Sequence, residues 1–291
     1  YGTTVGVEGL DLEVRRGEVF GFLGPNGAGK TTTIRLLLDL IRPTRGDASL
    51  FGRPVAESGL RGRVGYLPGE LALDGRLTGR QTLEFLAALR GRGAPPPPRG
   101  NRERCRARLG LSRDDLDRRV REYSRGMKQK LGLISALEHD PELLILDEPT
   151  TGLDPLVREA VFEILVEAGA AGRTVFHSSH VLSEVDRTCS RVGVIRAGRL
   201  VAVKRSDEIR RASVRRMVVR FDGPVPLAEL ELPGVELLER EGARVVLKVL
   251  GDLNPLLRML ARHRVNDLAF PEPSLEEAFD ELYRGGEEGL P

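Results

Sequence analysis

The sequence predicts an α/β protein with a mainly parallel sheet, followed by a small α+β domain. Short apolar segments that are typical of strands alternate with helical segments as far as about residue 205, and such alternation favours a parallel sheet. A glycine-rich turn, Gly24–Thr31, also separates a predicted strand from a predicted helix. With 291 residues, 40% of them hydrophobic, the chain is long enough for one large and one small domain.

The glycine-rich turn matches the phosphate-binding pattern G-x-x-x-x-G-K-[ST]. Its residues are Gly24, Pro25, Asn26, Gly27, Ala28, Gly29, Lys30 and Thr31. Glu18–Leu23 before it is a short, largely apolar segment that predicts a buried strand. After it, apolar residues recur at helical spacing, so we expect a helix to begin at Lys30. Those apolar residues are Ile34, Leu37, Leu38 and Ile41.

A turn of this kind directs successive backbone N–H groups at one point, and the helix dipole adds positive potential there. Gly27 and Gly29 allow backbone angles that a Cβ would penalise, so a phosphate can approach the main chain. Lys30 would supply charge to the β- and γ-phosphates, and the Thr31 hydroxyl is a natural ligand for Mg²⁺. The alternative is an ordinary glycine-rich surface turn, which the flanking strand and helix disfavour.

The first domain is expected to span residues 1–205, with a helical subdomain at about 71–138. In the segment before the phosphate loop, Leu10, Leu12 and Val14 alternate with Asp11 and Glu13, which predicts a half-buried strand in an antiparallel N-terminal subdomain. Further strands are predicted at Asp47–Phe51, Val64–Pro68, Leu143–Leu146, Thr174–His177 and, as a hairpin, Val192–Ile195 with Leu200–Val203. Helices are predicted at Thr78–Arg90, Arg102–Leu109, Ser112–Val120, Ser124–Leu137, Pro155–Ala168 and Val181–Cys189.

The second domain is expected at residues 214–284, a size that can fold alone. Strands are predicted at Val214–Phe221, Val235–Leu238, Val245–Leu250 and Val265–Ala269, and helices at Asn254–Arg262 and Ser274–Tyr283. Residues 285–291 are expected to be a tail.

Composition excludes several classes of protein. The net charge is only +2, aromatic residues make up 4% of the chain and Trp is absent, so a nucleic-acid partner is not expected. Cys105 and Cys189 follow no paired spacing, which favours reduced thiols in the cytoplasm. No apolar run approaches the roughly 20 residues that a spanning helix needs, and no signal peptide is recognisable.

Two acidic residues follow the strand predicted at Leu143–Leu146. Asp147 and Glu148 come directly after it, and an apolar strand that ends in carboxylates is the Walker B half of a nucleotide site. Asp147 would hold Mg²⁺, and Glu148 would polarise the attacking water. The alternative is a pair of solvated acids at a strand end, which the upstream phosphate loop disfavours.

Further motifs in this order resemble the ATP-binding cassette (ABC) ATPases. The segment Tyr123-Ser124-Arg125-Gly126-Met127 is similar to the family's signature Leu-Ser-Gly-Gly-Gln. Gly152-Leu153-Asp154 resembles the D-loop, and Ser178-Ser179-His180 resembles the switch-histidine segment. Tyr1 lies upstream of the phosphate loop, where the family has an aromatic residue that stacks on adenine. Ser124 and the N–H groups around Gly126 would also form an anion site at a helix N-terminus.

The resemblance implies the following assignment of sites. ATP and Mg²⁺ would be bound by Tyr1, the phosphate loop Gly24–Thr31, Thr32 and Asp147, with Thr31 and Asp147 on the metal. Lys30, Glu148 and His180 would be catalytic. The signature residues Tyr123, Ser124, Arg125, Gly126 and Met127 and the D-loop residues Gly152, Leu153 and Asp154 would face the ATP of a partner subunit.

The resemblance also implies partners and a location. A second copy of the chain and a multi-span membrane permease would be the partners, and the protein would be peripheral on the cytoplasmic face of the membrane. Arg125, Met127 and the end segment Glu272–Phe279 resemble the branch that pairs with separate export permeases for drugs, antibiotics or lipids. One departure is Gly69, followed by Glu70, where the family has Gln.

Two alternatives stay open at this point. One is a soluble, non-transport ABC ATPase that acts on a ribosome or nucleic acid, although such proteins usually carry two cassettes or a long coiled coil. The other is a P-loop enzyme such as a kinase, which would need no signature helix.

Overall fold

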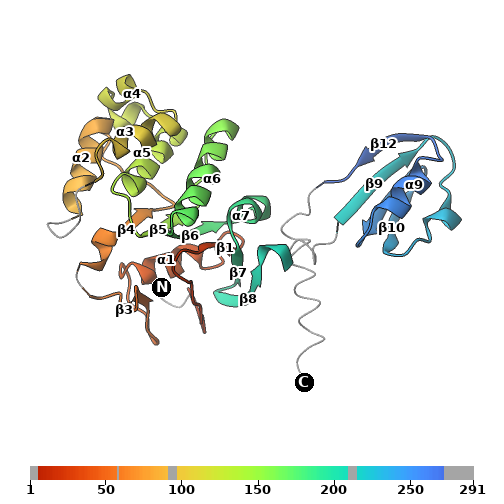
Figure 1. Ribbon diagram of the computed structural model, residues 1–291, viewed down its shortest axis with the longest axis horizontal. Helices are drawn as coiled ribbons and strands as arrows, with labels where there is room; N and C mark the ends of the chain where they lie inside the picture. Colours follow the sequence, from red (N-terminus) through yellow and green to blue (C-terminus); the bar gives the residue numbers. More distant parts are fainter. Residues whose placement is uncertain (1–5, 58, 91–96, 209–214, 272–291) are drawn as a thin grey trace. The chain divides into compact units, whose positions relative to one another are not determined.

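The chain forms two compact units that divide at Ser206/Asp207. The computed structural model in Figure 1 describes residues 6–57, 59–90, 97–208 and 215–271. The predicted helix at Ser274–Tyr283, the tail, the segment Glu272–Phe279 and Tyr1 lie outside these residues. No helix within the described ranges is long and apolar enough to cross a membrane.

The first unit is built on a six-stranded sheet in the order β4-β5-β6-β1-β7-β8. All neighbouring strands run parallel except β7 and β8, which form a hairpin, so the predicted mainly parallel sheet is confirmed. The strands are β1 (Val19–Leu23), β4 (Val64–Leu67), β5 (Leu143–Asp147), β6 (Thr174–Ser179), β7 (Arg191–Arg196) and β8 (Arg199–Arg205).

The central strands β1, β5 and β6 are buried almost throughout, as the continuous apolar segments predict. Phe20 of β1 stacks on Phe176 of β6, with ring centroids 5.8 Å apart. The sheet packs against α1 (Lys30–Leu37), α6 (Pro155–Ala170) and α7 (Leu182–Thr188), and its strand β4 also contacts α5 (Arg125–Leu137). Because β1 and β5 lie beside β6, the ends of these strands bring together residues that are far apart in sequence.

The expected strand around Leu10–Val14 is wrong, because residues 6–16 form no strand. The alternation itself is real: Leu10, Leu12 and Val14 are partly buried against the core, whereas Asp11 and Glu13 are exposed. Alternation with a period of two residues shows which side chains face the core. It does not require that the segment be hydrogen-bonded to a neighbouring strand. The predicted strand at 47–51 is likewise reduced to a two-residue ladder, β2 (Ser49–Leu50) with β3 (Arg53–Pro54), since Phe51 turns at φ 55°.

Four helices group together between β4 and β5, as Figure 1 shows, and the predicted helices of this region are confirmed. They are α2 (Gly79–Leu89), α3 (Asn101–Arg108), α4 (Arg113–Asp117) and α5 (Arg125–Leu137), with the 3-10 turn η2 (Val120–Glu122). Another 3-10 turn, η1 (Leu60–Arg63), directly precedes β4. Thr78 starts α2 through a capping box with Gln81, and Ser112 starts α4 in the same way. The helix α5 contacts α2, α3 and β4, so it links this group to the sheet.

The second unit has an antiparallel four-stranded sheet in the order β10-β11-β9-β12. Its elements are β9 (Arg215–Phe221), η3 (Leu227–Leu230), β10 (Val235–Glu241), β11 (Arg244–Val249), α9 (Asn254–Leu260) and β12 (Val265–Ala269). Buried residues of β9, β11 and α9 form a separate hydrophobic core. The four predicted strands and the predicted helix at 254–262 are confirmed as elements of an α+β unit.

Candidate nucleotide site

The phosphate loop connects β1 to α1, as the sequence predicts. Gly27 (φ 78°) and Gly29 (φ 108°) adopt the left-handed region, where a side chain would be strained. A Cβ on Gly29 would also lie 2.8 Å from the carbonyl oxygen of Gly6. These glycines let the chain turn directly into α1 at Lys30. The structure therefore presents the backbone N–H groups of this turn at a helix N-terminus.

The Lys30 side chain bends back across the loop. Its Nζ donates to the carbonyl oxygens of Gly24 (2.7 Å) and Pro25 (3.1 Å), and it lies 3.3 Å from Oε1 of Glu148. Lys30 is buried, so these oxygens replace the water that its ammonium group would otherwise bind. The same group has the charge and the position to bind phosphate oxygens.

Asp147, at the end of β5, is buried and held by two hydroxyl groups. The Thr31 Oγ1 donates to its Oδ2 at 2.6 Å, and the Ser178 Oγ donates to its Oδ1 at 2.5 Å. A carboxylate and a hydroxyl beside a phosphate loop are the hard oxygen ligands that Mg²⁺ prefers, with phosphates and water completing the shell. No group of three or more His, Cys, Asp or Glu side chains that could hold a metal occurs in the described ranges. The donor set thus fits a metal that binds with the nucleotide.

Glu148 projects toward Lys30 and the switch histidine. Its Oε1 lies 3.2 Å from His180 Nδ1, and its Oε2 accepts a hydrogen bond from Thr151 Oγ1 at 3.3 Å. Burial alone would raise the pKa of this carboxyl, but the charges of Lys30 and His180 outweigh burial and lower it. Glu148 is therefore held in the ionised form that can accept a proton.

Gly69 follows β4 and lies against the carboxylate of Asp147. A Cβ built on Gly69 would be 3.0 Å from Asp147 Oδ2. This is tighter than ordinary van der Waals contact, so the glycine leaves the carboxylate its space. The next residue, Glu70, is exposed.

The signature segment starts α5. The Ser124 Oγ accepts the N–H of Met127 at 3.2 Å and caps the helix. A Cβ on Gly126 would lie 2.8 Å from the carbonyl oxygen of Gly152, so the signature packs directly on the D-loop. Asp154 caps α6 by accepting the N–H of Val157. Tyr123 is buried, and its hydroxyl donates to the carbonyl oxygen of Asp115 at 2.6 Å.

The predicted residues therefore fall into two groups. Lys30, Thr31, Asp147, Glu148 and His180 lie together at the phosphate loop. The signature and D-loop residues lie together at the start of α5. Pro25, Asn26, Ala28 and Thr32 lie in the loop or the first turn of α1.

Two residues of this site were not among the predicted site residues. The sequence assigns no separate role to Ser178 within the switch segment, and none to Gln129. Ser178 pairs with Asp147 in the parallel ladder of β5 and β6, a register that the sequence does not give. Gln129 contacts the Walker B turn from α5, and only its polar character on a largely apolar helix face is visible in sequence.

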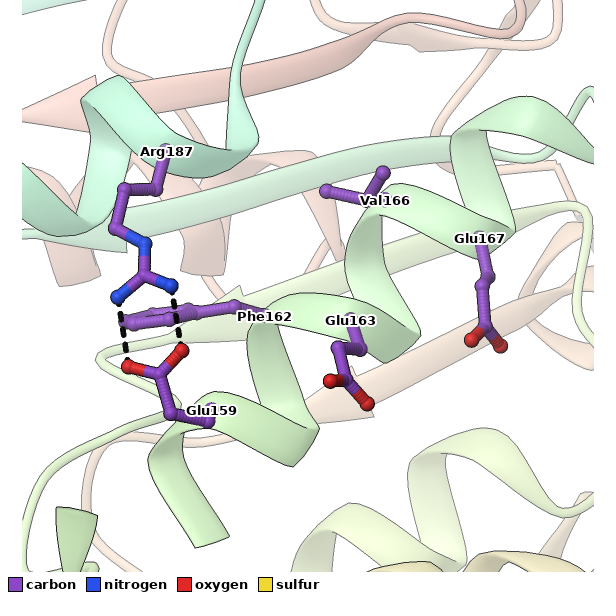
Figure 2. Close-up of a pocket in the computed structure, with 6 residues that line it drawn as sticks. All are labelled: Glu159, Phe162, Glu163, Val166, Glu167 and Arg187. Carbon is purple, nitrogen blue, oxygen red and sulfur yellow. Dashed lines mark hydrogen bonds and ion pairs between the residues drawn. The ribbon is translucent and has the colours of Figure 1, made fainter. Parts of the chain in front are cut away.

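A separate pocket lies on the outer side of α6 and contains no predicted site residue. Figure 2 shows its lining: Glu159, Phe162, Glu163, Val166, Glu167 and Arg187. Arg187 pairs with Glu159, and its guanidinium lies 5.1 Å from the centre of the Phe162 ring. Glu163 and Glu167 pair with Arg108, so the charged side chains of this pocket are paired with one another or with a neighbour, which distinguishes it from the phosphate loop.

The fold and the site define a P-loop nucleoside triphosphatase. The profile of the ABC transporter family matches residues 7–151. A daunorubicin resistance ATP-binding protein of Streptomyces coeruleorubidus is 37% identical over 294 residues, covering 96% of this chain and 91% of that protein. The chain therefore belongs to the ABC transporter ATP-binding proteins. It is an ATPase subunit of an ABC transporter, and it binds ATP with Mg²⁺.

Other relatives and a solved structure agree with this membership. An uncharacterised ABC transporter ATP-binding protein of Nostoc is 44% identical over 209 residues, or 70% of this chain, and the chain spans 61% of that relative. A fluoroquinolones export ATP-binding protein of Mycobacterium tuberculosis is 36% identical, covering 95% of this chain and 87% of that protein. The structure of an ATP-binding subunit of an ABC transporter superposes with a TM-score of 0.64 at 32% identity, covering 72% of this chain and 88% of that one.

Proposed function

We propose that two copies of this chain close over two MgATP molecules, and that closure drives a separate membrane permease. The observation that carries this proposal is the presence of two anion-receptive elements in one cassette. The phosphate loop is the first, and the capped N-terminus of α5 at Ser124 and Gly126 is the second. Among the described residues, no hydrogen bond or ion pair joins the two. The second element is thus available to a phosphate held by another copy.

The contacts of the site residues support the following roles. Glu148 accepts a proton from the attacking water, whose oxygen bonds to the γ-phosphorus as the bond to the β–γ bridging oxygen breaks, giving ADP and phosphate. Lys30 and His180 stabilise the charge on the transferred group. Thr31 and Asp147 would hold Mg²⁺, which would offset the charge of the phosphate oxygens.

The remaining assignments concern ATP binding and the partner site. Residues Gly24–Thr32 bind the phosphates, mainly through main-chain N–H groups at the start of α1, and Tyr1 stacks on the adenine. The signature residues Tyr123–Met127 and the D-loop residues Gly152–Asp154 face the nucleotide of the other copy. Residues 1–205 form the ATPase domain, and residues 214–284 form an accessory domain.

We infer that the transporter is an exporter of drugs, antibiotics or lipids. The names of the Streptomyces and Mycobacterium relatives, which match along most of this chain, support drug export. The chain would then act at the cytoplasmic face of the membrane, docked on a permease with several spans.

A pull-down of the tagged protein from detergent-solubilised host membranes, read by mass spectrometry, tests the proposal. A polytopic membrane protein recovered in near-equal amount is expected. Recovery of ribosomal or nucleic-acid proteins alone would favour the soluble alternative. Self-association is tested separately: Glu148→Gln with MgATP should elute as a dimer, and Ser124→Arg introduced into it should keep it monomeric.

A further inference from the structure

The main chain of Glu148 has an uncommon conformation. Its φ is 50°, in the left-handed region, at the point where the chain leaves β5. Residues with a Cβ adopt this region rarely, because the side chain approaches the backbone too closely. A glutamate in this conformation therefore depends on its surroundings to stay there.

Two side chains hold the main chain of Glu148 on either side of its Cα. The N–H of Glu148 donates to Ser178 Oγ at 3.0 Å. The Gln129 Nε2 donates to the carbonyl oxygens of Glu148 at 3.2 Å and of Pro149 at 3.1 Å. Ser178 is fully buried and Gln129 nearly so. Water therefore has little access to replace either contact.

Gln129 lies on the helix that the signature segment begins. It is the fifth residue of α5, which starts directly after Ser124, and a helix moves as a stiff unit over so short a distance. A shift of the signature would therefore move the amide of Gln129 relative to the two carbonyl oxygens. Only a donor suits this position, since an oxygen of the side chain would face two carbonyl oxygens.

We propose that Gln129 and Ser178 are positioning residues for Glu148, and that Gln129 ties the orientation of the catalytic carboxylate to the signature helix of the same subunit. The proposal rests on the proposed role of Glu148 as the proton acceptor. Neither residue touches the reacting atoms. Each fixes one of the two peptide units that flank the Cα of Glu148, so the distance between the carboxylate and the attacking water depends on both.

The test compares Gln129→Leu with Gln129→Lys in steady-state ATP hydrolysis. The leucine is similar in size but removes the side-chain donor, so the Glu148 carbonyl oxygen keeps only the N–H of Thr151 (3.2 Å) and the Pro149 carbonyl oxygen loses its bond to Gln129. The lysine supplies a donor, as Lys30 does for Gly24 and Pro25. We expect Gln129→Leu to lower kcat on the order of 10- to 100-fold, because small misplacements of a catalytic group have effects of this size. The KM should stay within about threefold of wild type, and Gln129→Lys should recover most of the kcat.

Two further measurements separate positioning from general damage. Thr82→Val, on α2, removes another buried hydroxyl group, which donates to the carbonyl oxygen of Thr78. This variant should leave kcat unchanged at a similar melting temperature. In a Glu148→Gln background, Gln129→Leu should cause no additional loss, because it acts through the carboxylate that is already gone.

The possible outcomes are distinct. Near-normal kcat in Gln129→Leu, or equal losses in the leucine and lysine variants, would overturn the positioning role. An additional loss in the Glu148→Gln background would overturn the route through Glu148. Near-normal turnover of Glu148→Gln itself would instead remove the proposed catalytic role, whatever Gln129 does.

Discussion

Lys30 Nζ lies 3.3 Å from Oε1 of Glu148, and His180 Nδ1 lies 3.2 Å from the same oxygen. One carboxylate oxygen is therefore shared between the lysine of the phosphate loop and the switch histidine. The three residues come from separate segments, and Lys30 lies more than a hundred residues before the other two. It also means that the two basic groups already lie around one negative charge, in the arrangement that a phosphoryl oxygen would require.

Glu148→Gln should bind ATP but hydrolyse it at least about a hundredfold more slowly, since general-base catalysis typically contributes about 10²–10⁴ in rate. The amide keeps the size of the side chain and cannot accept the proton. Steady-state phosphate release measures turnover, and equilibrium dialysis with labelled ATP measures binding. Near-normal turnover would remove Glu148 from the role of base.

Thr31→Val should raise the Mg²⁺ concentration needed for half-maximal ATPase activity. The substitution removes the hydroxyl that contacts Asp147 at 2.6 Å and keeps a side chain of the same shape. A loss of 10- to 100-fold in metal affinity is the order of magnitude expected for a lost partner at a metal site. Thr82→Val is the matched control, because it removes a buried hydroxyl away from the site. An unchanged Mg²⁺ dependence would exclude Thr31 as a ligand.

His177 should make the protein less stable in mild acid. It is buried beside Cys189 and Thr188, and burial lowers its pKa from 6.5 to about 4. Between these values the unfolded chain binds a proton that the folded chain does not, so the free energy of unfolding falls as the pH falls. Across this pH range the free energy of unfolding falls by roughly 3 kcal/mol.

Melting temperatures recorded from pH 8 to pH 4 test this effect. His177→Gln should be less stable at pH 8 but should lose less stability toward pH 4. Part of the pH dependence of the melting temperature should remain in His177→Gln, because burial also lowers the pKa of His139. Parallel curves for the two proteins would show that His177 is not the group responsible.

The phosphate loop and the Walker B strand could be predicted from sequence because their chemistry is local. Lys30 and Thr31 lie at fixed positions after the glycines, and Asp147 directly follows its strand. The partners of these residues could not be predicted in the same way. Ser178 reaches Asp147 only because β6 pairs with β5 in one register, and Gln129 reaches Glu148 only because α5 packs beside the Walker B turn. The strand expected at Leu10–Val14 failed for a related reason, since its alternation reports burial and not strand pairing.

A buried carboxylate, Glu138, joins three helices of the helical group. Arg90 at the end of α2 and Arg102 of α3 both contact its side chain, and Asn101 Nδ2 donates to its carbonyl oxygen at 2.9 Å. Glu138 is fully buried, whereas the Arg90 side chain is 14% exposed and the Arg102 side chain 35% exposed. The three side chains therefore differ in how much water can compensate for a lost partner.

Glu138→Leu should destabilise the protein by about 3–5 kcal/mol, because it leaves Arg90 buried without its counter-charge. Arg90→Met should cost less than Glu138→Leu, because Arg102 would still pair with the carboxylate. Arg102→Met should cost least, because Arg102 is partly solvated and Arg90 would still pair with Glu138. The double variant Glu138→Leu/Arg90→Met should recover much of the loss, since replacing a whole buried ion pair by apolar groups is often nearly neutral. Denaturant midpoints measure all four variants. Additive losses in the double variant would show that the two side chains do not act as a pair, because independent sites add whereas coupled ones do not.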